Sequence, residues 1–158
     1  MIFVTVGTHE QQFNRLLKEV DRLKGEGVIK DDVFMQTGFS DYKPQHCQWK
    51  SLISYDEMSR YMDEADIVIT HGGPATFMSV FANKKTPIVV PRKKQYEEHV
   101  NDHQLEFAYK LRERYAYFPI IDDINKLGEA ISQTGETSQF SSHNQEFCQS
   151  LADIVEGL

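Results

Sequence analysis

Short apolar runs that alternate with amphipathic helical patterns are the feature that most limits how this chain can fold. Residues 2–7 form a β-rich run that ends in glycine, and residues 33–38 repeat this pattern. Residues 67–70 and 87–90 are apolar at nearly every position, as expected of strands in a parallel sheet that helices cover on both faces. The alternation predicts an α/β fold with a single Rossmann-like, doubly wound parallel sheet.

Apolar residues at helical spacing occupy most segments between these runs. Ser54 or Asp56 is the expected N-cap of the second helix, and Pro74 suits the first turn of the third. We expect helices near residues 13–24, 54–65, 74–82, 99–112 and 124–131, and further short strands at residues 51–54 and 116–118.

The length of 158 residues fits one domain, and a complete second domain does not fit beside it. We predict this domain over residues 1–132. Residues 133–158 begin with a stretch rich in Ser, Thr and Gln, and end with apolar residues at helical spacing. They predict a polar linker and a C-terminal amphipathic helix, which either folds back on its own domain or docks a partner.

Charge and cysteine content exclude several classes of function. The 17 Lys and Arg against 24 Asp and Glu give a net charge of −7, which argues against nucleic acid as a partner because phosphate contacts need cations. Cys47 and Cys148 lack metal-ligand spacing, so we expect two reduced thiols and no metal site. No apolar run reaches the ~20 residues of a membrane span, so we expect a cytoplasmic protein that meets a membrane only peripherally, through a partner.

The loops after the predicted strands form the candidate site, because doubly wound sheets bind ligands at the carboxyl ends of their strands. Glycine lets a phosphate approach the backbone, and a helix that follows offers N–H groups at its positive end. The loop of residues 71–76 combines a strand, a glycine pair, a proline and a helix, and is the strongest candidate. The loop residues are Gly7, Thr8, His9 and Glu10; Gln36, Thr37 and Gly38; His71, Gly72, Gly73, Pro74, Ala75 and Thr76; and residues 92–103.

These loops also have purely structural explanations. Glycines after a strand serve tight turns whether or not a ligand binds, and His71 can simply bond within its own turn. The loops match neither G-x-G-x-x-G nor G-K-[ST], which argues against NAD and ATP, and no histidine pairs with a nucleophile in sequence. A group of cations is either solvated, or neutralises a diphosphate, or faces an anionic membrane. Its members are Lys84, Lys85, Arg92, Lys93 and Lys94.

Three motifs follow one another in an order that is more specific than any one of them. They are A-D-I-V-I-T-H-G-G-P-A-T at residues 65–76, T-P-I-V-V-P at residues 86–91, and residues 99–104 with Ala108. With V-T-V-G-T at residues 4–8, they resemble the nucleotide-sugar half of GT-B glycosyltransferases over most of the first 121 residues. The most similar group is the split type, in which this half is a separate small protein: the eukaryotic Alg13-like subunit and the bacterial PssE-like capsule and exopolysaccharide transferases.

The resemblance implies a UDP-sugar donor site. The corresponding positions are Gly7, Thr8, Gly72, Gly73, Thr76, His103 and Gln104. Gly7 and Thr8 would border the site. The glycine pair and Thr76 would lie by the diphosphate. His103 and Gln104 would reach the donor sugar or its phosphates. Relatives commonly carry a Glu three residues after the threonine to hold the ribose, where this chain has Ser79, which offers only a neutral hydrogen bond. His9 and Glu10 are the candidate catalytic bases.

The resemblance further implies the catalytic subunit of a two-component, inverting glycosyltransferase of capsule or exopolysaccharide synthesis. It would transfer a hexose or uronic acid, galactose first and glucuronic acid second, from UDP to a polyprenyl-diphosphate-linked acceptor. A membrane-anchored Alg14-like or PssD-like subunit is the expected partner at the cytoplasmic face. No cofactor or metal is expected, since the motifs lack a D-x-D carboxylate pair. The alternative is a non-catalytic nucleotide-sugar-binding subunit that stabilises or regulates a separate glycosyltransferase.

Overall fold

One parallel β-sheet organises the residues that the computed structural model describes, which are 1–7, 12–71, 74–83, 85, 87–96, 103–114, 118–121 and 123–136. Its strands are β1 (Ile2–Thr5), β2 (Val33–Gln36), β3 (Gln48–Lys50), β4 (Ile67–His71) and β5 (Pro87–Val90). They are hydrogen-bonded in the order β3-β2-β1-β4-β5, and each is parallel to its neighbours. The predicted parallel sheet is confirmed.

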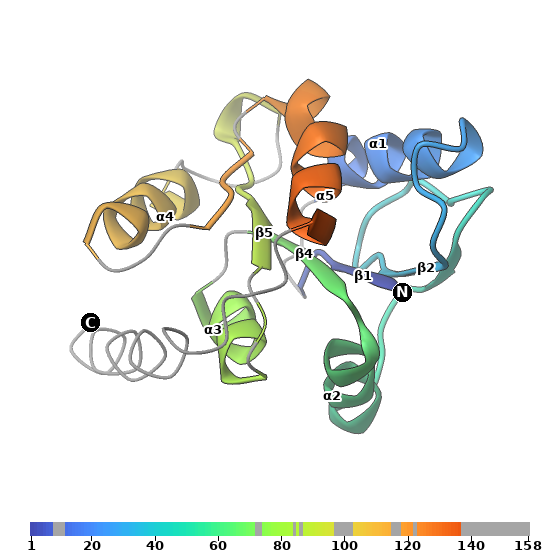
Figure 1. The fold of residues 1–158 in the computed structure, drawn as a ribbon, viewed down its shortest axis with the longest axis horizontal. Helices are drawn as coiled ribbons and strands as arrows, with labels where there is room; N and C mark the ends of the chain where they lie inside the picture. The colour runs from blue at the N-terminus through green and yellow to red at the C-terminus, as the bar shows by residue number, and fades with distance from the viewer. Residues whose placement is uncertain are drawn as a thin grey trace.

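Helices cover both faces of this sheet (Figure 1). They are α1 (Asn14–Gly25), α2 (Tyr55–Glu64), α3 (Pro74–Ala82), α4 (His103–Arg114) and α5 (Leu127–Glu136), with short 3₁₀ turns at Lys94–Tyr96 and Ile124–Lys126. α1 and α5 lie on one face, and α2 and α3 lie on the other. Helices on both faces of a parallel sheet define a doubly wound fold, so the predicted fold class is confirmed.

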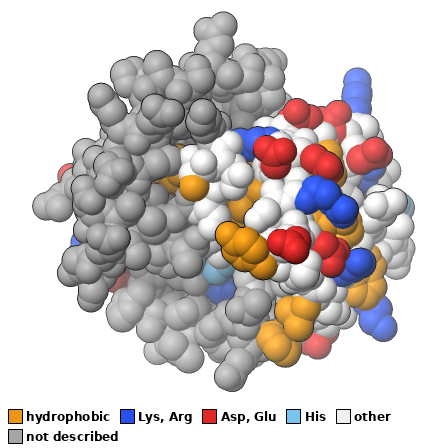
Figure 2. Space-filling view, turned by 90° about the horizontal axis from the view of Figure 1, so that it is seen from below, with side chains coloured by type: hydrophobic (Ala, Val, Ile, Leu, Met, Phe, Trp, Pro, Cys, Tyr) orange, Lys and Arg blue, Asp and Glu red, His pale blue; other side chains and the backbone are white. Residues whose placement is uncertain are grey.

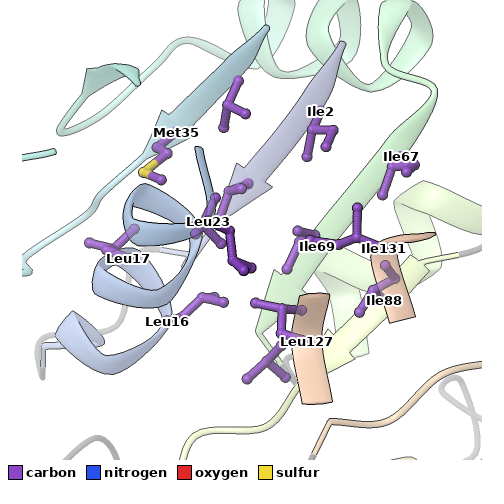
Figure 3. Close-up of a cluster of buried hydrophobic side chains, with 14 of the residues drawn as sticks. Ile2, Leu16, Leu17, Leu23, Met35, Ile67, Ile69, Ile88, Leu127 and Ile131 are labelled. Carbon is purple, nitrogen blue, oxygen red and sulfur yellow. The ribbon is translucent and has the colours of Figure 1, made fainter. Parts of the chain in front are cut away.

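Alternate residues of each strand face opposite layers of helices. Ile2 and Val4 of β1 belong to a cluster of buried apolar side chains that includes Leu127 of α5, and part of this cluster is drawn in Figure 3. Phe3, between them in sequence, belongs to a second cluster with Met62 of α2. Strand side chains alternate with a period of two, so β1 is buried on both faces. This explains why the central strands are almost continuously apolar in sequence.

Helix α2 is fixed at both ends by polar contacts. A backbone N–H of its first turn donates to Oγ of Ser54 at 3.1 Å, so Ser54 is the N-cap and Asp56 lies in the first turn. At the other end, Nζ of Lys85 donates to the carbonyl oxygens of Asp63 and Ala65. A lysine at this position satisfies carbonyls that the last turn of a helix leaves unpaired.

Strand β3 lies earlier than the sequence predicts, at Gln48–Lys50 instead of residues 51–54. It forms one edge of the sheet, with Gln48 and Lys50 exposed and Trp49 half-buried. An edge strand of this kind has no apolar run to reveal it in the sequence. The N–H of Gly38 still donates to the carbonyl of Ser51 at 2.8 Å, so the pairing with the β2 loop extends just past the strand.

The C-terminal part of the chain is described only in pieces. The strand predicted at residues 116–118 falls largely outside the described residues, and Ile120 forms an isolated parallel bridge to Val89. Helix α5 continues past residue 132, the predicted end of the domain. The predicted C-terminal helix lies outside the described residues. Of the helices in the ranges given above, none has both the length and the apolar character that a membrane span requires.

Candidate functional site

The strand order reverses between β1 and β4. The chain winds from β1 outwards to β2 and β3, and then places β4 and β5 on the other side of β1. The carboxyl ends of β1 and β4 are adjacent, because Thr5 and Thr70 are paired in the sheet register. Doubly wound sheets bind ligands at such a switch point, outside the carboxyl ends of the strands. The residues just beyond β1 and β4 therefore define the candidate site.

Gly7, His71 and Thr76 meet at this switch point. Gly7 has a φ of +74°, a backbone conformation that favours glycine. A Cβ at this position would overlap the imidazole of His71, whose Cε1 would lie only 2.9 Å away. The Nε2 of His71, which is buried, lies 3.1 Å from Oγ1 of Thr76 in the first turn of α3. The imidazole therefore fills the space between the end of β1 and the start of α3.

Gln36 holds Gly7 from the neighbouring strand β2. Its Oε1 accepts a hydrogen bond from the hydroxyl of Thr5 at 2.6 Å, and its Nε2 donates to the carbonyls of Gly7 and Ser51 at 3.1 and 3.0 Å. The residue is 1% exposed, and these bonds use both N–H groups of its amide. Gln36 was predicted as a ligand contact, but this geometry is that of a residue that positions the end of β1.

Gly38 contacts the same turn through its backbone. Its φ is +59°, and a Cβ there would lie 2.8 Å from the carbonyl oxygen of Gly7. Glycine at both positions thus permits two loops to approach each other closely. These contacts within the protein account for Gly7 and Gly38 as turn residues, whether or not a ligand binds beside them.

Arg92, which follows β5, is completely buried. It is 0% exposed, its Nη2 donates to the carbonyl of Val6 at 2.7 Å, and its Nη1 donates to the carbonyl of Gln12 at 3.2 Å. The guanidinium also lies 5.0 Å from the centre of the Phe13 ring. The predictions that Arg92 is solvated, or faces a membrane, are therefore wrong. Its charge is used inside the protein, where backbone carbonyls and an aromatic ring compensate for the loss of water.

The other cations of the predicted cluster do not gather around Arg92. Lys85 bonds the carbonyls at the end of α2, just before β4 begins, so it lies at the opposite edge of the sheet from the switch point. Lys84 and the side chain of Lys94 are outside the described residues, and Lys93 is partly buried. Figure 2 shows a face on which the described Lys and Arg side chains are interspersed with Asp and Glu.

The remaining predicted site residues are described only in part. Ser79 lies one turn after Thr76 on α3 and is exposed. Outside the described residues are Thr8, His9, Glu10, Gly72 and Gly73. Only the backbone is described, within α3 and α4, for Pro74, Ala75, His103 and Gln104. Across the described ranges, no three His, Cys, Asp or Glu side chains are grouped so that they could hold a metal ion.

A buried carboxylate on α1 was missed by sequence reasoning. Asp21 is 2% exposed, and it accepts hydrogen bonds from the hydroxyl of Tyr42 at 2.5 Å and from the backbone N–H groups of residues 45 and 46 at 3.0 and 2.8 Å. Burial raises the pKa of Asp21, but these hydrogen bonds outweigh burial and leave the pKa below its usual value. The available signal was a charged residue on the apolar face of a predicted helix, where it needs partners.

Cys47 lies beside this carboxylate. Burial, with the neighbouring Asp21 charge, raises the pKa of the Cys47 thiol to about 12. Cys47 is a free cysteine among the described residues, and Cys148, the other predicted thiol, lies outside them. Since the thiolate is the reactive form of cysteine, this environment argues against a nucleophilic role.

Comparisons with known proteins point to one family. The family described as "Glycosyltransferase family 28 C-terminal domain" matches residues 1–156. Among solved structures, the chain is similar to the crystal structure of the glycosyltransferase SnogD from Streptomyces nogalater, with 16% sequence identity and a TM-score of 0.47. This similarity covers 98% of the chain and 42% of the SnogD chain, so the present chain spans less than half of that protein. Curated proteins give no match.

Proposed function

This chain belongs to the glycosyltransferase family 28 C-terminal domain family, and we propose that it forms the nucleotide-sugar donor site of a glycosyltransferase. The observation that carries the proposal is the meeting of Gly7, His71 and Thr76 at the switch point between β1 and β4. Helix α3 begins just beyond β4, so its N-terminal N–H groups and positive dipole end lie at the same edge. A diphosphate is the part of a donor that such a helix terminus stabilises.

The pair formed by His71 and Thr76 suits this role chemically. In the tautomer that carries its proton on Nε2, the imidazole donates to Oγ1 of Thr76 across the 3.1 Å separation. The hydroxyl of Thr76 is then free to donate its own proton to a phosphate oxygen. In the other tautomer, the hydroxyl donates to the imidazole instead. We therefore propose that His71 orients the Thr76 hydroxyl toward the diphosphate.

The other donor contacts follow from the resemblance to split GT-B transferases. Ser79, exposed one turn after Thr76, is at the position for the ribose. His103 and Gln104, in the first turn of α4, are at the positions for the donor sugar. His9 and Glu10 stay the candidate bases that deprotonate the acceptor hydroxyl.

The finer proposal concerns substrate and partner. We propose UDP as the nucleotide, with galactose as the first and glucuronic acid as the second choice of sugar, and a polyprenyl-diphosphate-linked acceptor of capsule or exopolysaccharide synthesis. Residues 1–156 match a C-terminal domain family, which supports the proposal that another half, outside these residues, binds the acceptor. We propose that a membrane-anchored subunit supplies that half. Donor and acceptor must be held together, since proximity can supply about 7–11 kcal/mol of the barrier.

Reconstitution tests this function. The full chain would be co-expressed with the product of the neighbouring gene, and the membranes would be assayed with labelled UDP-sugars and a polyprenyl-diphosphate-linked acceptor. We expect transfer only when both proteins are present, and about a tenfold loss for Thr76→Val, equal to about 1.4 kcal/mol. Ser132→Ala is the control, because it removes an exposed hydroxyl that donates to the carbonyl of Gly128 within α5, outside the candidate site.

The outcomes separate two functions. Transfer of sugar that requires both proteins supports the catalytic proposal. UDP binding without transfer, for every sugar and with the partner present, supports the alternative of a non-catalytic nucleotide-sugar-binding subunit. Full transfer by the purified chain alone contradicts the two-component proposal, because one donor domain then suffices.

A further inference from the structure

We propose that Arg92 is a positioning residue that ties together both ends of the segment between β1 and α1, and so holds Gly7 in register with His71. The inference rests on the proposed function only for the ligand that the site would take. Its structural part depends on contacts among described residues: Arg92 itself, Val6 just after β1, and Gln12 and Phe13 just before α1.

The two terminal nitrogens of the guanidinium serve different ends of the segment. Nη2 donates to the carbonyl of Val6, and Nη1 donates to the carbonyl of Gln12. A guanidinium presents its N–H groups in a rigid planar fork, so one side chain can hold two acceptors at a set spacing. A lysine ammonium, at the end of a flexible stem, lacks this geometry. The two hydrogen bonds therefore require the planar guanidinium of arginine, and a positive charge alone does not replace it.

Three further contacts join the same two parts of the chain. Nη2 of Arg15 donates to the carbonyl of Pro91 at 3.3 Å, its guanidinium lies 4.8 Å from the centre of the Tyr96 ring, and Nε2 of Gln12 donates to the carbonyl of Tyr96 at 3.0 Å. The start of α1 and the segment after β5 are thus connected at several points. Strand β4 lies between β1 and β5 in the sheet, so these contacts connect the strands on either side of His71.

This connection bears on the candidate site through Gly7. Val6, which Arg92 holds, directly precedes Gly7, and Gly7 is packed so closely on the imidazole of His71 that a Cβ would overlap it. A shift of Val6 would therefore change the space available to His71 and its contact with Thr76. Arg92 itself is 0% exposed, with both terminal nitrogens bonded to carbonyls. It acts on a ligand through Gly7 and His71, and not by binding phosphate itself.

Two variants of Arg92 and one matched control test the inference. Arg92→Met removes both hydrogen bonds, and Arg92→Lys keeps the charge without the fork. Lys85→Met is the control, because Lys85 is also a cation that donates to two backbone carbonyls, but at the end of α2. The first measurement is amide hydrogen exchange of the full chain without ligand, resolved by peptide. The second is calorimetric titration with UDP at a temperature at which each variant is folded.

We expect both Arg92 variants to speed exchange in the peptide covering residues 1–16 by about tenfold, while peptides from β2 and α2 exchange as in the wild type. Lys85→Met should affect only the end of α2. The affinity for UDP should fall by about tenfold in both Arg92 variants, equal to about 1.4 kcal/mol, and stay within about twofold of the wild type in the control. Arg92→Lys should melt closer to the wild type than Arg92→Met does, and still fail to restore UDP binding.

Three results would overturn the inference. Unchanged exchange in residues 1–16 would show that Arg92 does not hold this segment. Unchanged exchange with lost UDP affinity would show that Arg92 is a direct ligand of the nucleotide. Faster exchange throughout the chain in Arg92→Lys would assign Arg92 a general role in stability. If the wild type does not bind UDP, the proposed function fails, and the exchange measurement still decides the role of Arg92.

Discussion

Replacing Gly7 with alanine tests the geometry of the switch point. The backbone of Gly7 has a φ of +74°, and a Cβ would lie 2.9 Å from Cε1 of His71 and closer still to Nε2. Alanine therefore introduces two separate costs, backbone strain and displacement of the imidazole. Gly27 offers a matched control, since its φ is +82° and a Cβ there has no neighbour within 4 Å. Gly27→Ala carries only the backbone cost.

The two costs can be estimated from the structure. A left-handed backbone conformation costs a residue other than glycine about 1–2 kcal/mol. Displacing His71 breaks its hydrogen bond to Thr76, which lies at 3.1 Å, and a bond of this kind contributes about 0.5–1.5 kcal/mol. We therefore expect Gly7→Ala to lower the free energy of unfolding by about 1.5–3.5 kcal/mol. Gly27→Ala should lower it by about 1–2 kcal/mol.

Urea unfolding followed by circular dichroism measures these differences, and a double-mutant cycle isolates the contact. His71→Ala removes the imidazole, so that Gly7→Ala in this background should cost no more than the backbone strain. We expect a coupling energy of about 1 kcal/mol between the two positions. Melting temperatures should follow, at about 2–4 °C for each kcal/mol in a chain of this size.

The reasoning fails if Gly7→Ala costs the same with and without His71. Equal effects of Gly7→Ala and Gly27→Ala would likewise show that the imidazole accommodates a Cβ freely. In either case the close packing of Gly7 on His71 would not position the imidazole, and the argument for Thr76 as an oriented donor would lose its structural basis.

Three further predictions concern other parts of the molecule. Asp21→Asn should destabilise the chain by about 1.5–3 kcal/mol at pH 7, as measured by urea unfolding. Folding lowers the pKa of Asp21, so the stability difference between wild type and variant should be fully present above pH 3.8, the ordinary pKa. The difference should disappear as the pH falls through the lowered pKa of the folded state. Cys47, with a pKa of about 12, should react with iodoacetamide at pH 8 at least ~10²-fold more slowly in the folded than in the urea-unfolded chain, as followed by peptide mass spectrometry. Gln104→Ala should lower turnover of the reconstituted enzyme by about 10²-fold, or about 2.7 kcal/mol, and hardly change UDP affinity, because a contact to the sugar matters most in the transition state.

The parts of the fold that could be predicted are those with strong local patterns. β4 and β5 are buried on both faces, so their residues form continuous apolar runs, and the N-cap of α2 is a local contact with Ser54. β3 was misplaced because an edge strand with polar residues at Gln48 and Lys50 has no such pattern.

The candidate site likewise contains some residues whose position the sequence could predict and others whose contacts it could not. Gly7, His71 and Thr76 could be proposed because they follow strands in a doubly wound pattern. The burial of Arg92 could not be predicted, because its hydrogen-bond partners, Val6 and Gln12, lie 86 and 80 positions earlier in the sequence. Its neighbours in sequence are typical of a solvated basic segment. The hydrogen bonds of Gln36 could not be foreseen for a related reason: its partners come from β1 and the residue after it, and from the segment after β3. The burial of a polar side chain is decided by such distant segments.

Calorimetric titration of the full chain with UDP, in buffer that contains EDTA, tests the donor-site proposal most directly. We predict saturable binding with a Kd between about 1 µM and 1 mM, the range typical of enzyme substrates. UMP should bind more weakly because it lacks the second phosphate, and Thr76→Val should weaken UDP binding by about tenfold. A folded chain that shows no saturable binding of millimolar UDP, in the presence or absence of EDTA, would contradict the claim that the switch point between β1 and β4 is a nucleotide-sugar site.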